Sequence, residues 1–138
     1  MKLMITLLTL FSASAYACSC SQWGTARQLL SEYDVAYVGT LAGSRDGGIS
    51  PDGDPVRLNT FKVLKAFKPR TLRKKFSLRS QQGDGGNCGT MFTRNTSYLV
   101  FGYTYRGRTY TDLCSYRAID NSREMRTLLR DLDRASAL

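Results

Sequence analysis

The chain has 138 residues, of which 20 are lysine or arginine and 11 are aspartate or glutamate, and its formal net charge is +9. It contains no histidine, which excludes a Ser-His-Asp triad, a Cys-His dyad and every metal site built on imidazole ligands. A chain of this length supports one domain with a modest core and is too short for two.

Residues 1–17 have the features of a secretory leader. Lys2 gives a positive start, an apolar stretch follows, and the segment ends in a small-x-small cleavage site at Ala17. The apolar stretch is too short to cross a bilayer, which takes about 20 apolar residues. We therefore expect a signal peptide over 1–17, a single mature domain over 18–138, and export to the extracellular space or the periplasm. Lipidation of Cys18 is the alternative.

Four cysteines follow the leader, namely Cys18, Cys20, Cys88 and Cys114. An even count in an exported protein predicts two disulfides. Cys18 and Cys20 are too close in sequence to bridge each other without strain. This leaves two pairings open, Cys18 with Cys88 and Cys20 with Cys114, or the exchange of these partners. The usual paired C-x2-C spacing of a four-thiol zinc site is missing. We expect no metal or cofactor of the protein's own.

The first part of the mature chain predicts a helix and then a strand. A short helix is expected over 25–33, with Thr25 as its N-cap. Residues 35–41 are rich in β-branched and aromatic side chains and predict a strand. Residues 43–55 contain four glycines, two prolines and three aspartates, and this composition predicts an exposed loop.

The middle of the chain predicts the remaining strands. Alternating apolar and polar residues indicate strands over 58–67 and 76–80. The polar, glycine-containing segment 81–87 predicts a surface turn. The most apolar strand is expected over 97–104, and a hairpin follows over 105–111.

The last element is a helix capped by Asn121 or Ser122. Its apolar residues form one stripe that is expected to face the core, made of Met125, Leu128, Leu129 and Leu132. Five strands with a helix near each end predict a mainly β fold, a small five-stranded closed barrel of the oligonucleotide/oligosaccharide-binding (OB) type.

Several short motifs occur in a specific order along the mature chain. They are Cys18-Ser19-Cys20-Ser21, the strand TFKVLKAFK at 60–68, Cys88-Gly89, Tyr98-Leu99-Val100-Phe101-Gly102, and Leu113-Cys114. Together they resemble the N-terminal, netrin-like domain of the tissue inhibitors of metalloproteinases, over residues 18 to about 116. Residues 22–28 depart from that family, which has a Pro/His-rich stretch and a further cysteine there.

The resemblance implies roles for residues at the start of the mature chain. It implies disulfides between Cys18 and Cys88 and between Cys20 and Cys114. It also implies that the α-amine and carbonyl oxygen of Cys18 chelate the catalytic zinc of a metalloendopeptidase, with Ser19 pointing into the pocket beside the metal. The residues expected to form the protease-contact ridge are Ser19, Cys20, Ser21, Asn87, Cys88 and Gly89.

A second function class follows from charge. Without Lys2, 19 basic residues against 11 acidic residues leave +8. The basic residues that crowd two neighbouring strands and their turn are Lys62, Lys65, Lys68, Arg70, Arg73, Lys74 and Lys75. They predict either a site for sulfated glycans or another polyanion, or a solvated face. Export argues against a nucleic-acid partner.

The sequence gives an enzyme little support. Glu32, Asp112 and Asp120 are isolated acids without the spacing of an acid/base pair. We expect a monomeric, non-enzymatic protein.

Overall fold

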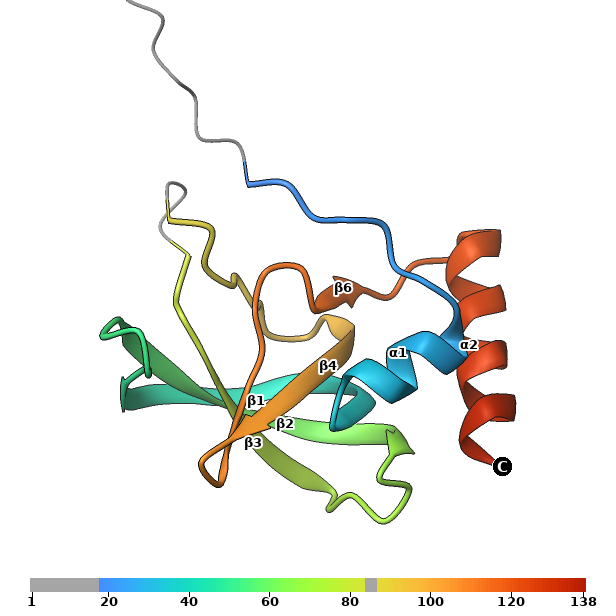
Figure 1. The fold of residues 1–138 in the computed structure, drawn as a ribbon, viewed down its shortest axis with the longest axis horizontal. Helices are drawn as coiled ribbons and strands as arrows, with labels where there is room; N and C mark the ends of the chain where they lie inside the picture. The colour runs from blue at the N-terminus through green and yellow to red at the C-terminus, as the bar shows by residue number, and fades with distance from the viewer. Residues whose placement is uncertain (1–17, 84–86) are drawn as a thin grey trace, which may run out of the picture.

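The computed structural model describes residues 18–83 and 87–138 (Figure 1). The predicted leader lies outside the described residues, as does part of the predicted turn at 81–87. The elements are α1 (Ala26–Glu32), β1 (Val35–Ile49), β2 (Pro55–Lys68), β3 (Lys75–Ser80), β4 (Ser97–Tyr105), β5 (Arg108–Tyr110), β6 (Tyr116–Ala118) and α2 (Arg123–Ser136). Within the described ranges, no helix has the length and apolar character needed to cross a membrane.

Five of the six strands close into a ring. The order around the sheet is β1-β2-β3-β5-β4, and β4 returns to pair with β1, while β6 pairs with the other side of β4. The closing contact between β1 and β4 is antiparallel and runs from Val35↔Gly102 to Thr40↔Ser97. The contact between β3 and β5 is a single parallel pair, Arg79↔Tyr110. The predicted mainly β fold, with a short helix before the strands and a longer one after them, is confirmed.

The first part of β1 and residues 98–102 of β4 are buried on both faces, and their alternate residues enter two different hydrophobic clusters. The cluster inside the ring consists of Val35, Tyr37, Phe61, Leu78, Tyr98 and Val100. The cluster between the sheet and the helices consists of Ala26, Leu29, Ala36, Phe67, Leu99, Phe101, Met125 and Leu132. Double-sided burial explains why 98–101 is a continuous apolar run, because a strand covered on both faces has no solvent side to make polar.

The prediction of an exposed loop over 43–55 is wrong. Strand β1 continues through this stretch to Ile49 and pairs with β2 as a long bent hairpin, so that only 50–54 form the turn. The pairing register shifts between Asp46 and Gly48, where Gly48 has φ +88°. Gly48 therefore serves a bulge in a twisted hairpin, where a left-handed backbone is needed, and Gly53 serves the turn.

The two helices begin where the sequence predicts. The Thr25 side chain accepts from the backbone of Gln28, and the Gln28 side chain accepts from the backbone of Thr25, which completes a capping box. Ser122, one of the two predicted caps, accepts from the Met125 backbone N–H at 3.0 Å. Met125 and Leu132 are buried against the sheet, so the predicted core-facing stripe is confirmed.

Two buried tyrosines in the ring differ in their hydrogen bonding. The Tyr98 hydroxyl accepts from the Thr93 backbone N–H at 2.8 Å. The Tyr37 hydroxyl is fully buried and has no hydrogen-bond partner within the described part of the chain. Burial raises the pKa of Tyr37 well above its ordinary value.

This difference predicts opposite effects of removing the two hydroxyls. We expect Tyr37→Phe to raise the free energy of unfolding by about 1 kcal/mol, because it removes a buried polar group that gains no hydrogen bond. We expect the matched variant Tyr98→Phe to lower it by about 1 kcal/mol. Thermal or denaturant unfolding of the two oxidised variants measures this, and a loss of stability in Tyr37→Phe equal to that in Tyr98→Phe would contradict it.

Candidate functional site

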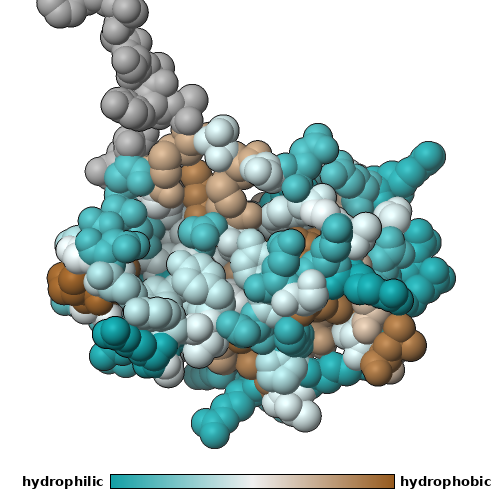
Figure 2. Space-filling view, in the orientation of Figure 1, coloured by the Kyte–Doolittle hydropathy of each residue, from teal (hydrophilic) through white to brown (hydrophobic). Residues whose placement is uncertain are grey.

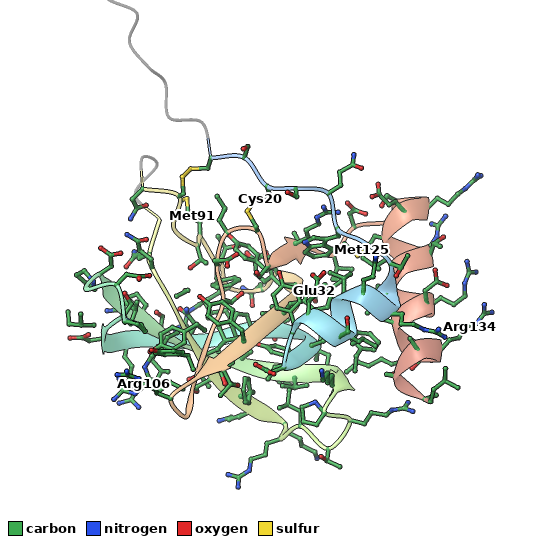
Figure 3. All side chains as sticks on the ribbon, viewed as in Figure 1. Cys20, Glu32, Met91, Arg106, Met125 and Arg134 are labelled. Atoms are coloured by element: carbon green, nitrogen blue, oxygen red, sulfur yellow. A yellow bond between two sulfur atoms is a disulfide. The ribbon has the colours of Figure 1, made fainter. Side chains whose placement is uncertain are left out.

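Two disulfides fix the start of the described chain. Cys18 is bonded to Cys88 with a Cα–Cα distance of 5.5 Å, and Cys20 is bonded to Cys114 with a distance of 5.3 Å. This is the pairing that the resemblance implies, and the other pairing left open by the sequence is not formed. Disulfides are typical of proteins in oxidising compartments. Figure 3 shows the first disulfide at the start of the described chain and Cys20 further along it.

The segment held by these disulfides is exposed and extended. Residues 18–21 are all exposed and belong to no helix or strand. Figure 1 shows the segment passing over one edge of the molecule before it enters α1. Along its side runs an open groove of about 510 Å³ that is also lined by Gln28, Glu32 and Tyr33. We call residues 18–21 together with Asn87, Cys88 and Gly89 the N-terminal ridge.

Trp23 anchors the far end of this segment. Its indole Nε1 donates to the Cys114 carbonyl oxygen at 2.8 Å, and its ring meets Phe101 edge-on at 5.1 Å. The guanidinium of Arg117 lies over the other part of the ring, 4.1 Å from the centroid. Trp23 therefore ties the segment to the residue that holds the second disulfide. Sequence reasoning gives Trp23 no role at this site, because no local signal links it to a carbonyl 91 positions away.

The Cys88-Gly89 pair has a specific backbone role. Cys88 has φ 58°, in the left-handed region. Gly89 is buried against the 82–83 backbone, and a Cβ at this position would lie 2.5 Å from the Gln82 carbonyl oxygen. The Gly89 N–H donates to the Asn87 side-chain oxygen at 3.1 Å, and the Asn87 amide donates to the Gln82 carbonyl at 2.8 Å. Only glycine lets the backbone at position 89 come so close to the backbone at 82–83. The neighbouring Cys88 is the residue bonded to Cys18.

A buried polar network lies next to this loop and supports it. Thr90, which follows Gly89, is hydrogen-bonded through its hydroxyl to Ser80 at 2.6 Å, and Ser80 accepts from the Asn59 amide at 2.7 Å. Asn59 in turn accepts from the Ser44 hydroxyl at 3.0 Å. Each buried member of this chain has a partner, so its hydrogen bonds offset the cost of desolvation and the network adds rigidity. Sequence reasoning did not find this network, whose members lie between positions 44 and 90.

One side of the ridge faces a small acidic cavity. This cavity of about 190 Å³ is lined by Cys88, Gly89, Asp52, Asp112 and Tyr103, among others. Partial burial is the main cause that raises the pKa of Tyr103, and the negative charges of Asp112 and Asp52 raise it further. Burial and the two aspartates therefore disfavour a negative charge on Tyr103 beside the ridge.

The ridge offers neither an activated nucleophile nor a metal site of its own. Among the hydrogen bonds of the described residues, none links Ser19 or Ser21 to an acidic or basic side chain. Within 18–83 and 87–138, no cluster of three or more His, Cys, Asp or Glu side chains is arranged to hold a metal ion. What the ridge presents is exposed backbone and small side chains at a fixed chain end.

The fold separates the predicted polyanion-binding residues into those with a partner inside the protein and those without one among the described residues. Lys68 Nζ donates to the carbonyls of Leu30 and Tyr33 at 2.6 and 2.8 Å, at the end of α1. Lys65 and Arg70 contact Asp133 at 2.9 and 3.8 Å. The members that are exposed and form no ion pair with another described residue are Lys62, Arg73, Lys74 and Lys75.

Asp133 forms ion pairs with two of these basic residues, Lys65 and Arg70. The hydrogen bond from Lys65, with the charges of Lys65 and Arg70, lowers the pKa of Asp133 below its ordinary value. Three of the seven predicted residues therefore have internal partners, and the seven do not form one free cationic surface.

No family model and no curated protein matches this chain. The function is inferred from the chemistry of the N-terminal ridge and from the resemblance of the cysteine motifs.

The close approach at Gly89 predicts that substitution there disturbs the ridge. We expect Gly89→Ala to lower the free energy of unfolding by about 1–3 kcal/mol, because the new methyl group must displace backbone. Gly43→Ala is the matched control, since a Cβ at that position meets nothing within 4 Å, and we expect a change below about 0.5 kcal/mol. Equal unfolding temperatures for the two variants would contradict this account of the Cys88-Gly89 pair.

Proposed function

We propose that this protein is an exported inhibitor of zinc metalloendopeptidases. In this proposal the ring of strands is a five-stranded, OB-fold-like closed barrel that resembles the N-terminal domain of the tissue inhibitors of metalloproteinases. Cleavage after Ala17 makes Cys18 the first residue. Its α-amine and carbonyl oxygen then chelate the catalytic zinc of the target protease. The observation that carries the proposal is the pair of disulfides that hold exposed residues 18 and 20 to two distant loops.

The chemistry of chelation needs only backbone atoms. A catalytic zinc site has three protein ligands and keeps one position for water. A neutral amine and the carbonyl oxygen of the same residue form a five-membered chelate ring that displaces this water. An α-amino group has a pKa of about 7.7 to 8.0, so its neutral form is available near neutral pH. Cys18 supplies both atoms once it is the first residue.

Pre-organisation supplies the affinity that a flexible chain end lacks. Fixing the backbone of one residue costs about 1–2 kcal/mol, and a free terminus meets this cost on binding. Here the disulfide at Cys18, the disulfide at Cys20 and the Trp23 anchor hold the segment at three points before any partner arrives. Most of the ordering cost is therefore met during folding.

The side chains of the ridge suit contact with a protease cleft. Ser19 follows the chelating residue and is exposed, which places a small hydroxymethyl group beside the metal. A small group enters many pockets and fills few of them deeply, so the proposal includes broad specificity. Ser21 and Asn87 flank this contact, while the buried Gly89 shapes the loop that carries Cys88.

A polyanion-binding module without inhibitory activity is the second candidate function. Lys62 and Lys75 are direct partners in the antiparallel β2–β3 pairing, and both are exposed. Side chains of directly opposite residues lie on the same face of a sheet, so two positive charges stand side by side there. Retention on a sulfated glycan that is lost when Lys62 and Lys75 are changed to glutamine, with no inhibition of any protease, favours this candidate over the inhibitor.

The chelation proposal is tested by changing only the chain end. We expect the chain that starts at Cys18 to inhibit at least one member of a panel of zinc endopeptidases. Adding one alanine before Cys18 moves the amine away, and acetylating the α-amine of Cys18 converts it to an amide whose delocalised lone pair no longer binds the metal. Since a metal contact contributes several kcal/mol and 1.4 kcal/mol is tenfold, each change should weaken inhibition by about 100-fold or more.

The control for this experiment is the fold of the altered proteins. All three forms should have both disulfides and the same unfolding temperature, because the amine forms no part of the core. Equal inhibition by the three forms, or inhibition by none of them, would refute chelation by Cys18.

A further inference from the structure

The outward side of α2 carries a row of arginines. Arg123, Arg126, Arg130 and Arg134 are spaced three or four residues apart, and all four are exposed. This spacing places them on one face of the helix, over about 16 Å at 1.5 Å per residue. The opposite face holds Met125 and Leu132 against the core. We call the four residues the α2 arginine stripe; Figure 3 labels Arg134 on the outer side of α2.

The stripe has no carboxylate partners within the described residues. The ion pairs of these residues join Lys65 and Arg70 to Asp133 and join Arg117 to Glu124, and none includes a member of the stripe. Arg126 Nη1 donates to the carbonyl of Asn121 at 2.8 Å, which is a neutral acceptor. The positive charge of the stripe is therefore open to solvent, and Figure 2 shows hydrophilic side chains projecting over this end of the molecule.

The placement of most of these charges opposes the stability of the helix itself; Arg134, in the last turn, is the member whose charge favours it. Arg126 with Arg130, and Arg130 with Arg134, are like charges at the i,i+4 spacing, which is destabilising in a helix. Arg123 is the first residue of α2, at the positive end of the helix dipole. Residues that disfavour their own helix without stabilising another part of the fold are expected at functional sites.

The choice of arginine points to an oxyanion ligand. The five lysines beyond Lys2 all lie within 62–75, whereas the basic residues of α2 are all arginine. The planar guanidinium donates two parallel hydrogen bonds to a sulfate or phosphate group, which an ammonium does not. The basic surface also continues past the helix, because Asp133 on α2 contacts both Lys65 and Arg70 and neutralises only one of them.

We propose that the α2 arginine stripe binds a linear sulfated polysaccharide laid along the helix axis. Its repeated sulfate groups complement a straight row of guanidinium groups. Insertion into a membrane needs an open apolar helix face, and that face of α2 is packed against the core. Single-stranded nucleic acid is held by aromatic stacking platforms, and α2 contains no aromatic residue.

Heparin oligosaccharide binding tests this site with two variants of equal charge. The first variant, Arg126→Gln, Arg130→Gln and Arg134→Gln, removes three charges from α2. The second, Lys62→Gln, Lys74→Gln and Lys75→Gln, removes three charges from β2, β3 and the turn between them. We expect the first variant to lose at least tenfold in heparin affinity and the second to stay within about threefold of the unaltered chain. On a sulfonate cation exchanger both variants should elute equally early, because their net charges match.

Several outcomes overturn the proposal. An equal loss in both variants assigns binding to net charge, and a loss in the second variant alone assigns it to β2–β3. Tighter binding of the unaltered chain to vesicles of anionic phospholipid, or to a single-stranded oligonucleotide, than to heparin would assign the stripe to another partner. The first variant should keep its unfolding temperature, since the change relieves like-charge pairs.

This surface is separate from the N-terminal ridge. Figure 1 shows α2 at one end of the molecule and the start of the described chain away from it. The protein with an alanine added before Cys18 should therefore keep its full heparin affinity. Failure of protease inhibition and failure of heparin binding are distinguishable in the same preparations.

Discussion

The covalent attachment of residues 18 and 20 to Cys88 and Cys114 is the constraint on which the functional surface depends. The segment at 18–21 has no strand ladder or helix to hold it, so its order comes from these two links and from Trp23. The links close intervals of 70 and 94 residues, and on the chain-entropy model each such closure contributes about 4 kcal/mol to stability. The same bonds therefore stabilise the domain and fix its exposed end.

The double-sided burial of the first part of β1 and the centre of β4 determines which surfaces remain free. One face of these strands fills the ring and the other receives both helices, so the apolar side of α2 is used in the core. Among the surfaces left exposed, two differ strongly in chemistry. The N-terminal ridge presents backbone atoms and small side chains, while the outer side of α2 presents guanidinium groups. The proposed activities of the two surfaces do not compete for the same residues.

Local signals in the sequence predicted the local features of the fold. Thr25 and Ser122 cap their helices because capping depends on neighbours three residues away. The long β1–β2 hairpin was not predicted, because a glycine-rich segment that forms bulges has the same composition as one that forms a loop. The sequence reduced the cysteine pairings to two, and the resemblance implied the one that forms. The roles of Trp23 and Gly89 were missed, since both depend on contacts made only in three dimensions.

The central claim is that the mature protein begins with an unmodified amine on a disulfide-bonded Cys18. Mass spectrometry of natively exported protein, digested without reduction, tests this most directly. The account predicts a peptide that starts at Cys18, carries a free α-amine and is linked through sulfur to the peptide containing Cys88. A first residue other than Cys18, an acyl group on its amine, or an unpaired thiol at this position would contradict it.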